Sequence, residues 1–140
     1  MTTPADAFAA LQEAERSGEL ARLADRLSLG LIVVFGSVAR GDPSADDLDV
    51  AVSSRPGTRL DILDVVNALL ELTRFDDVDV MDLDRADALA RQHALVPGEP
   101  LYEYESGGFV REQLRASAER LSTEWMRQAD LVLLAGGDPP

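Results

Sequence analysis

Aspartates occupy alternate positions at the start of two short apolar segments. Asp47 and Asp49 lie in "DLDVAV", residues 47–52, and Asp79 lies between two valines in residues 77–82. Side chains two positions apart on a strand point to the same face, and opposed residues on neighbouring strands lie about 5 Å apart. Pairing of the two segments would therefore gather three carboxylates on one face of a sheet.

Three neighbouring carboxylates repel one another, which raises their pKa values, unless a cation lies between them. The chain contains no cysteine and one histidine, His93. Oxygen ligands without sulfur or imidazole suit Mg²⁺ or Mn²⁺ rather than Zn²⁺. The sequence therefore predicts a divalent metal site with Asp47, Asp49 and Asp79 as ligands. A solvated strand face is the alternative, and Asp77 is the alternative third carboxylate.

A glycine and a serine follow the most apolar segment, "LIVVF". A buried strand that runs into Gly36 and Ser37 leaves backbone N–H groups and a hydroxyl free to bind phosphate oxygens, with Arg40 nearby as a counter-charge. Arg40 could instead form an ion pair with Asp42 or Asp46. A phosphate-binding turn beside a divalent metal site indicates a nucleoside triphosphate.

Hydrophobic periodicity and turn residues predict the elements that position these groups. The expected elements are, in chain order, two helices before Gly30, a strand at residues 31–35, a strand at 47–52, a helix capped by Thr58, a strand at 77–82, a helix at about 85–95, an edge strand at 100–105 and a long helix at about 108–134. We expect one α+β domain, residues 1–140, with a small mixed sheet covered by helices on one face.

Helical spacing also predicts which side chains face the core. In the helix after Thr58 these are Leu60, Leu63, Val66 and Leu70, and Asp84 is expected to cap the next helix.

The long C-terminal helix carries apolar residues at intervals of three and four, among them Leu114, Leu121 and Trp125. Such a stripe is expected to pack against the core. Leu131, Leu133 and Leu134 cannot all face one core, which indicates a surface for a partner.

The composition excludes some classes of function. The formal net charge is -13, and all 13 basic residues are arginines. This charge opposes nonspecific binding to nucleic acid or to anionic membranes, and it favours a basic protein partner or a small ligand. The apolar segments are too short to span a bilayer and the first residues do not resemble a signal peptide, so we expect a cytoplasmic protein.

Two motifs in this order resemble the signature of the DNA polymerase β nucleotidyltransferase superfamily: "GSVARG", residues 36–41, and "DLDVAV". The short chain resembles the minimal nucleotidyltransferase (MNT) branch, and "VDVMDLDRADALARQHALVPGEPLYE" resembles the second half of such domains. The resemblance covers about residues 20–105. The interval from Ser37 to Asp47 is one residue shorter than in the commonest family form, and Asp46 replaces a serine that is frequent there.

The resemblance implies roles for individual residues. Gly36 and Ser37 would bind the triphosphate, Asp47 and Asp49 would bridge two Mg²⁺ ions, and Asp79 would bind one metal and assist the acceptor hydroxyl as a base. The hydroxyl would attack the α-phosphorus and displace pyrophosphate.

The resemblance also implies a biological role. Small MNT proteins are commonly encoded beside HEPN-domain ribonuclease toxins, so the implied function is an antitoxin that transfers AMP from ATP to a tyrosine hydroxyl of its toxin. The resemblance also implies a hetero-oligomer with that toxin. Alternatives are a nucleotidyltransferase of the aminoglycoside-modifying type, an antitoxin that neutralises its partner by binding without catalysis, and an acidic interaction domain that binds no nucleotide.

Overall fold

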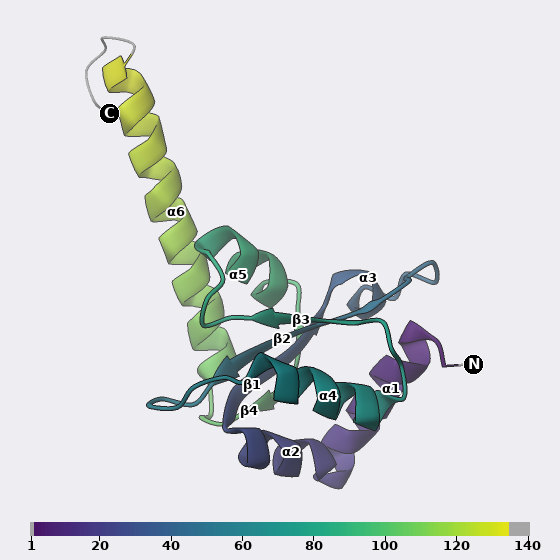
Figure 1. The fold of residues 1–140 in the computed structure, drawn as a ribbon. Coiled ribbons are helices and arrows are strands. Elements are labelled where there is room, and N and C mark those ends of the chain that lie inside the picture. The colour runs from purple at the N-terminus through teal and green to yellow at the C-terminus, as the bar shows by residue number, and fades with distance from the viewer. Residues whose placement is uncertain (1, 135–140) are drawn as a thin grey trace.

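Six helices and four strands make up the described part of the chain, residues 2–134 of a computed structural model (Figure 1). The elements are α1 (Pro4–Ser17), α2 (Glu19–Leu27), β1 (Leu29–Phe35), α3 (Gly36–Ala39), β2 (Leu48–Ser54), α4 (Ile62–Thr73), β3 (Val78–Asp82), α5 (Ala88–Leu95), β4 (Glu99–Glu103) and α6 (Gly108–Leu134). Their order confirms the predicted α+β class.

The four strands form one mixed sheet in the order β3-β2-β1-β4. β1 pairs antiparallel with both β2 and β4, whereas β2 and β3 are parallel and joined through α4. In this register Asp49 lies opposite Phe35 on one side and opposite Asp79 on the other. β4 is an edge strand, as predicted, and Pro100 lies on it, where a missing N–H is tolerated.

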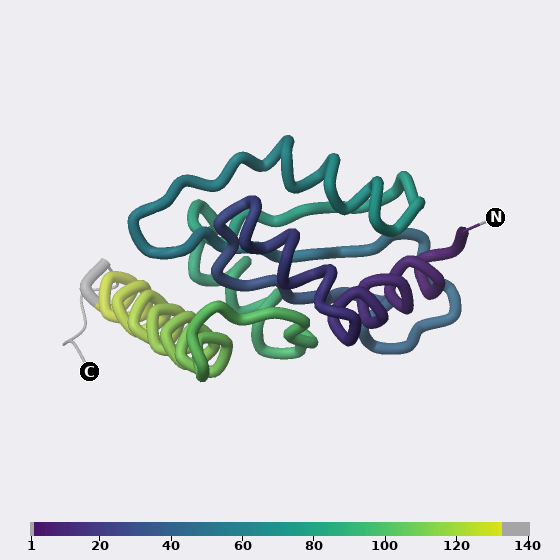
Figure 2. Tube along the Cα trace, turned by 90° about the horizontal axis from the view of Figure 1, so that it is seen from below, coloured from purple at the N-terminus to yellow at the C-terminus, as the bar shows by residue number. Residues whose placement is uncertain are grey.

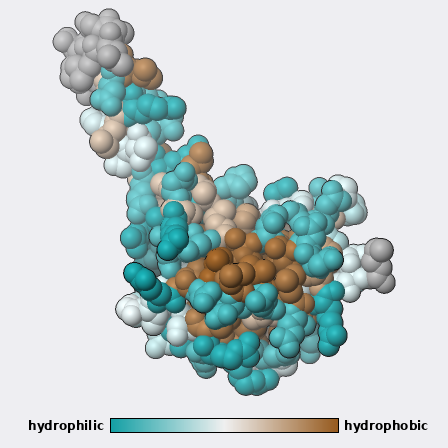
Figure 3. All heavy atoms as spheres, in the orientation of Figure 1, coloured by the Kyte–Doolittle hydropathy of each residue, from teal (hydrophilic) through white to brown (hydrophobic). Residues whose placement is uncertain are grey.

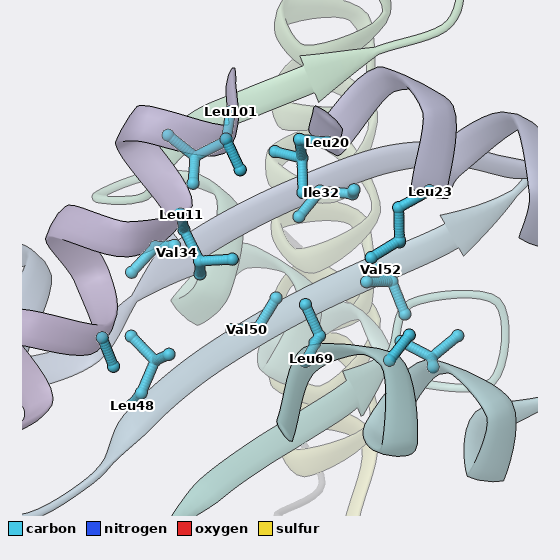
Figure 4. Close-up of a cluster of buried hydrophobic side chains, with 14 of the residues drawn as sticks. Leu11, Leu20, Leu23, Ile32, Val34, Leu48, Val50, Val52, Leu69 and Leu101 are labelled. Carbon is cyan, nitrogen blue, oxygen red and sulfur yellow. The ribbon is translucent and has the colours of Figure 1, made fainter. Parts of the chain in front are cut away.

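Helices α1, α2 and α4 cover one face of the sheet (Figure 2). Ile32, Val34, Val50 and Val52 point to this face and pack against leucines of the helices, including Leu69 (Figure 4). The alternate strand residues form a second, smaller cluster with α5 and the beginning of α6, on the opposite face. Helices thus cover the predicted face and also part of the other one.

Capping residues explain where the helices begin. Thr3 caps α1 with reciprocal hydrogen bonds to Asp6. The prediction that Thr58 caps α4 is wrong: Asp61 accepts a hydrogen bond from Asp64 N, while the Thr58 hydroxyl donates to the Arg55 carbonyl at 2.7 Å. Several cap-forming residues lie close together here, so local sequence does not distinguish them.

Asp84 does not cap α5, contrary to the prediction. Asp87 is the cap and accepts from Ala90 N at 2.8 Å. The Asp84 carboxylate instead accepts hydrogen bonds from the backbone N–H and the hydroxyl of Ser54. It therefore joins the segment after β3 to the end of β2.

The inward face of α4 differs from the prediction at Leu63, which is 68% exposed. The buried residues of this helix are Val65, Ala68, Leu69 and Thr73. These residues also have helical spacing, so the apolar pattern of this helix is compatible with more than one inward face. Apolar side chains gather on the face of the body around α4 and β3 (Figure 3).

The prediction that the apolar stripe of the C-terminal helix is buried is also wrong. Phe109 and Ala116 attach α6 to the body, whereas Leu121 and Trp125 are 70% and 58% exposed. The Glu103 carboxylate fixes the start of α6 by accepting from the N–H groups of Gly107 and Phe109. The side chains of Leu133 and Leu134 lie outside the described ones. Among residues 2–134, no helix is long and apolar enough to cross a membrane.

Candidate active site

The carboxylates of Asp47, Asp49 and Asp79 meet at one end of the sheet. One oxygen from each lies within 4.8 Å of the others. Asp47 directly precedes β2, and Asp49 and Asp79 are paired in the parallel register of β2 and β3. The cluster therefore depends on two strands that start at the same end of the sheet, beside the point where β1 ends.

Asp77 lies outside this cluster. It precedes β3, and its carbonyl oxygen accepts a hydrogen bond from Leu48 N at 3.0 Å. Its negative charge still raises the pKa values of Asp47 and Asp49. The geometry thus favours Asp79 over Asp77 as the third ligand, while Asp77 adds to the negative potential around the site.

Hydrogen bonding, burial and mutual repulsion change the protonation of the cluster. A hydrogen bond with the Asp79 carboxyl, followed by burial and by the charges of the other aspartates, raises the pKa of Asp47 to about 6. Burial is the main cause that raises the pKa of Asp49, with the charges of Asp79 and Asp77 next and Arg40 in opposition. Without a cation, the three carboxylates reduce their negative charge by binding a proton. A divalent cation would neutralise more of this charge, and carboxylate oxygens are suitable ligands for a hard divalent metal.

Gly36 lies directly against the Asp49 carboxylate. Its φ of +78° is in the left-handed region, and a Cβ at this position would overlap Asp49 Oδ2. Only glycine avoids both problems, because it has no Cβ. The sequence pattern assigned Gly36 to phosphate binding; the structure adds that this glycine leaves room for the carboxylate.

Ser37 and Arg40 lie on or next to α3, which begins where β1 ends. The Asp42 carboxylate accepts from the N–H and hydroxyl of Ser44, and within residues 2–134 Arg40 forms no ion pair with any carboxylate. The alternative pairing of Arg40 with Asp42 or Asp46 is therefore not formed. The exposed guanidinium remains available to an anion.

The titration of Asp47 predicts how the protein responds to pH and Mg²⁺. Because the pKa in the folded state, about 6, exceeds the ordinary value of 3.8, the folded chain binds the proton more tightly than the unfolded chain. The contribution of Asp47 to stability is complete below pH 3.8 and is lost as the pH rises through about 6. Since Mg²⁺ competes with this proton, the shift in melting temperature caused by Mg²⁺ should be larger above pH 6 than below it.

Thermal melting over this pH range, with and without Mg²⁺, measures the effect. The Asp47→Asn variant provides the control, because it lacks the titrating group and should lose most of the pH dependence of the Mg²⁺ shift. A Mg²⁺ shift that is independent of pH in the unmodified protein would contradict the prediction.

Comparisons with known proteins agree with this geometry. The family described as "Polymerase beta, Nucleotidyltransferase" matches residues 20–106. The chain therefore belongs to the polymerase β nucleotidyltransferase family, which confirms the predicted resemblance. Among curated proteins, no sequence matches this chain significantly.

Solved structures with the same fold come from toxin–antitoxin complexes. One, with AMP-PNP, is 22% identical with a TM-score of 0.64, over 84% of this chain and 97% of that one. A second, a tri-AMPylated HEPN toxin of Shewanella oneidensis with its MNT antitoxin, is 22% identical with a TM-score of 0.62, over 89% and 98% of the two chains. An MntA–HepT complex is 20% identical with a TM-score of 0.61, over 88% and 98%. At these identities the likeness establishes the fold, that of the MNT antitoxins.

Proposed function

We propose that this chain is a Mg²⁺-dependent antitoxin that transfers AMP from ATP to a tyrosine hydroxyl of a HEPN-domain ribonuclease toxin. The observation that carries the proposal is the meeting of Asp47, Asp49 and Asp79 within 4.8 Å, with Gly36 directly against Asp49. The family supplies the nucleotidyl transfer. The related complexes, which contain AMP-PNP or an AMPylated toxin, support the choice of nucleotide and acceptor.

Some residues of the site would bind the nucleotide, and Asp79 would act on the acceptor. Asp47 and Asp49 would together hold two Mg²⁺ or Mn²⁺ ions, which would supply positive charge beside the triphosphate. The Gly36–Ser37 turn and the free guanidinium of Arg40 would hold the phosphates in line with the acceptor.

Asp79 is the most exposed of the three aspartates and is therefore placed on the acceptor side. Its carboxylate would accept the proton of the attacking hydroxyl. A bond then forms between the acceptor oxygen and the α-phosphorus as the bond to pyrophosphate breaks.

A protein acceptor suits this chain better than an antibiotic. Among the related complexes, one contains an AMPylated HEPN toxin, which is a protein acceptor. The net charge of -13 is compatible with a basic protein partner and opposes direct binding to nucleic acid. Cytoplasmic localisation, which ATP and such a partner require, remains a prediction.

The test first requires identification of a HEPN reading frame beside the gene for this chain. The purified chain is then incubated with that HEPN protein, Mg²⁺ and ATP labelled at either the α or the γ position. We expect label on the partner from α-labelled ATP only, with release of pyrophosphate and an AMP adduct on tyrosine in the mass spectrum. Label on an aminoglycoside would support the small-molecule alternative. Neutralisation of the partner without any transfer would identify a non-catalytic antitoxin.

A further inference from the structure

Strand β3 leaves one of its two edges without a partner strand. It is the terminal strand of the sheet and pairs only with β2. At one end of this parallel pairing, Leu48 N donates to the Asp77 carbonyl. At the other end, Leu83 N donates to the Val52 carbonyl. Because backbone groups alternate in direction along a strand, the odd-numbered residues of β3 direct their N–H and C=O groups toward β2, and the even-numbered residues direct theirs outward.

The outward backbone groups lie beside the metal site. Within residues 2–134, the N–H and C=O groups of Val78 and Val80 have no hydrogen-bond partner. An open edge of this kind can pair with a strand from another chain. Asp79 lies between the two valines and is exposed. A segment that pairs with this edge therefore runs directly beside the aspartate on the acceptor side of the site.

Helix α4 provides an apolar surface along the same edge. One side of the helix faces α2, and its residues Ala68 and Leu72 line a pocket between the two helices. The other side carries Ile62, Val66 and Leu70, which we call the α4 flank and which are exposed or half-buried. Because the first side faces α2, the α4 flank faces the border of the sheet that β3 forms, and α4 lies along this border (Figure 2). Apolar side chains gather on this face of the molecule (Figure 3).

Acidic residues lie at both ends of the open edge. Asp76 and Asp77 precede β3, Asp84 follows it, and all three are exposed. Negative charge around a short edge strand opposes pairing with most other strands, including those of an acidic chain such as this one. It favours a segment with basic residues at its ends, because the two charges are complementary.

We propose that the acceptor segment of the partner protein binds at this edge as an extended fifth strand and presents its tyrosine to Asp79, an inference that rests on the proposed transfer to a protein tyrosine. Val78 and Val80 pack on the face of the sheet that α4 covers, so Asp79 points to the other face. A tyrosine on the Asp79 face places the residues before and after it against the α4 flank. The site therefore selects a tyrosine between two apolar residues, in an extended segment with basic ends.

Amide hydrogen exchange of the full chain, resolved by NMR, tests the pairing. The probe is the synthetic peptide KVTVYVTVK, added with Mg²⁺ and AMP-PNP. We expect the amides of Val78 and Val80 to exchange at least about 10-fold more slowly when the peptide is bound. The amides of Asp79 and Met81 point toward β2 and are the matched controls, since they are protected in both states. The peptide KVTPYPTVK, in which proline replaces the two valines beside the tyrosine, should give no protection. Failure of the first peptide to protect Val78 and Val80, or equal protection by the second, would overturn the inference.

Kinetics of AMP transfer to the partner protein test the α4 flank. Leu70→Asn should raise the KM for the partner at least about 10-fold with little change in kcat, because an apolar contact that binds the segment contributes equally before and during transfer. Leu72→Asn is the matched control: Leu72 is also half-buried on α4 but faces α2, so the KM should not change. Melting curves establish that both variants fold. An equal effect of the two substitutions on KM would count against the α4 flank as part of the acceptor site.

The two experiments separate this inference from the proposed function. Transfer of AMP to the partner without protection of Val78 and Val80 would overturn the edge-strand inference and support the proposed function. Protection of these two amides by the peptide without any transfer would overturn the proposed function and support the binding of an extended segment at β3.

Discussion

Replacement of Asp47 or Asp49 by asparagine is expected to reduce AMP transfer to the partner by about 10³-fold, equivalent to about 4 kcal/mol of transition-state stabilisation. Both carboxylates belong to the cluster of three within 4.8 Å, and an amide cannot supply the negative charge that holds a divalent cation. Transfer of label from α-labelled ATP measures the loss.

The same variants should be at least as stable as the unmodified protein in the absence of metal. A hydrogen bond with Asp79 for Asp47, burial for Asp49 and then the neighbouring negative charges raise the pKa values of these aspartates. Removal of one charge therefore relieves burial of a charged group and repulsion in the folded state. The stabilisation by Mg²⁺ should disappear at the same time. This combination distinguishes loss of a metal ligand from general unfolding.

Asp77→Asn is the matched control for these variants. Asp77 is close enough to affect the pKa values of Asp47 and Asp49, but it is not part of the cluster. Its substitution should change transfer by only a few-fold. If Asp77→Asn were as damaging as Asp49→Asn, or if a variant lacking both Asp47 and Asp49 still transferred AMP, the proposed roles would be wrong.

Gly36→Ala is expected to reduce transfer by about 10²-fold, since displacement of a catalytic group by about 1 Å has this effect. The added Cβ would overlap the Asp49 carboxylate, which must then move away from Asp47 and Asp79. The left-handed backbone adds a cost to folding of about 1–2 kcal/mol.

Gly57→Ala separates these two effects. Gly57 has the same φ of +78°, but no atom lies within 4 Å of the position that its Cβ would take. Both variants should therefore lose similar backbone stability, measured by denaturant unfolding, and only Gly36→Ala should lose transfer and Mg²⁺ binding. Equal transfer by the two variants would show that the Asp49 carboxylate tolerates the displacement.

Much of the site is predictable from sequence because strand periodicity is simple. The alternation of side chains along a strand predicts that Asp47 and Asp49 lie on one face of the sheet and Val50 on the other, and the structure has this arrangement. The approach of Asp79 required the pairing of β2 with β3, which the family resemblance and the repeated aspartate–valine pattern both favoured. The contact of Gly36 with Asp49 could not be predicted, because it depends on the separation of two chain segments in space.

The errors in the predicted fold arise where sequence signals are ambiguous. Thr58 and Asp61 are both good capping residues, as are Asp84 and Asp87. The Thr58 hydroxyl forms a local hydrogen bond with the Arg55 carbonyl, whereas Asp84 forms a tertiary hydrogen bond with Ser54. The stripe on α6 has the periodicity of a core-facing helix, and periodicity alone does not indicate whether the covering surface belongs to the same molecule. Trp125 is exposed, so no surface of the same chain covers this side chain.

The parallel connection from β2 through α4 to β3 has an evolutionary consequence. All three clustered aspartates lie within residues 47–79, a contiguous segment bounded by exposed residues at 41–44 and at Asp84 and Arg85. Recombination at the two corresponding positions in the gene would transfer the codons for all three metal ligands to another gene as one cassette, that is, one contiguous piece. Gly36, which must accommodate the Asp49 carboxylate, lies outside the cassette, so a recipient would have to provide a glycine of its own at the end of the adjoining strand.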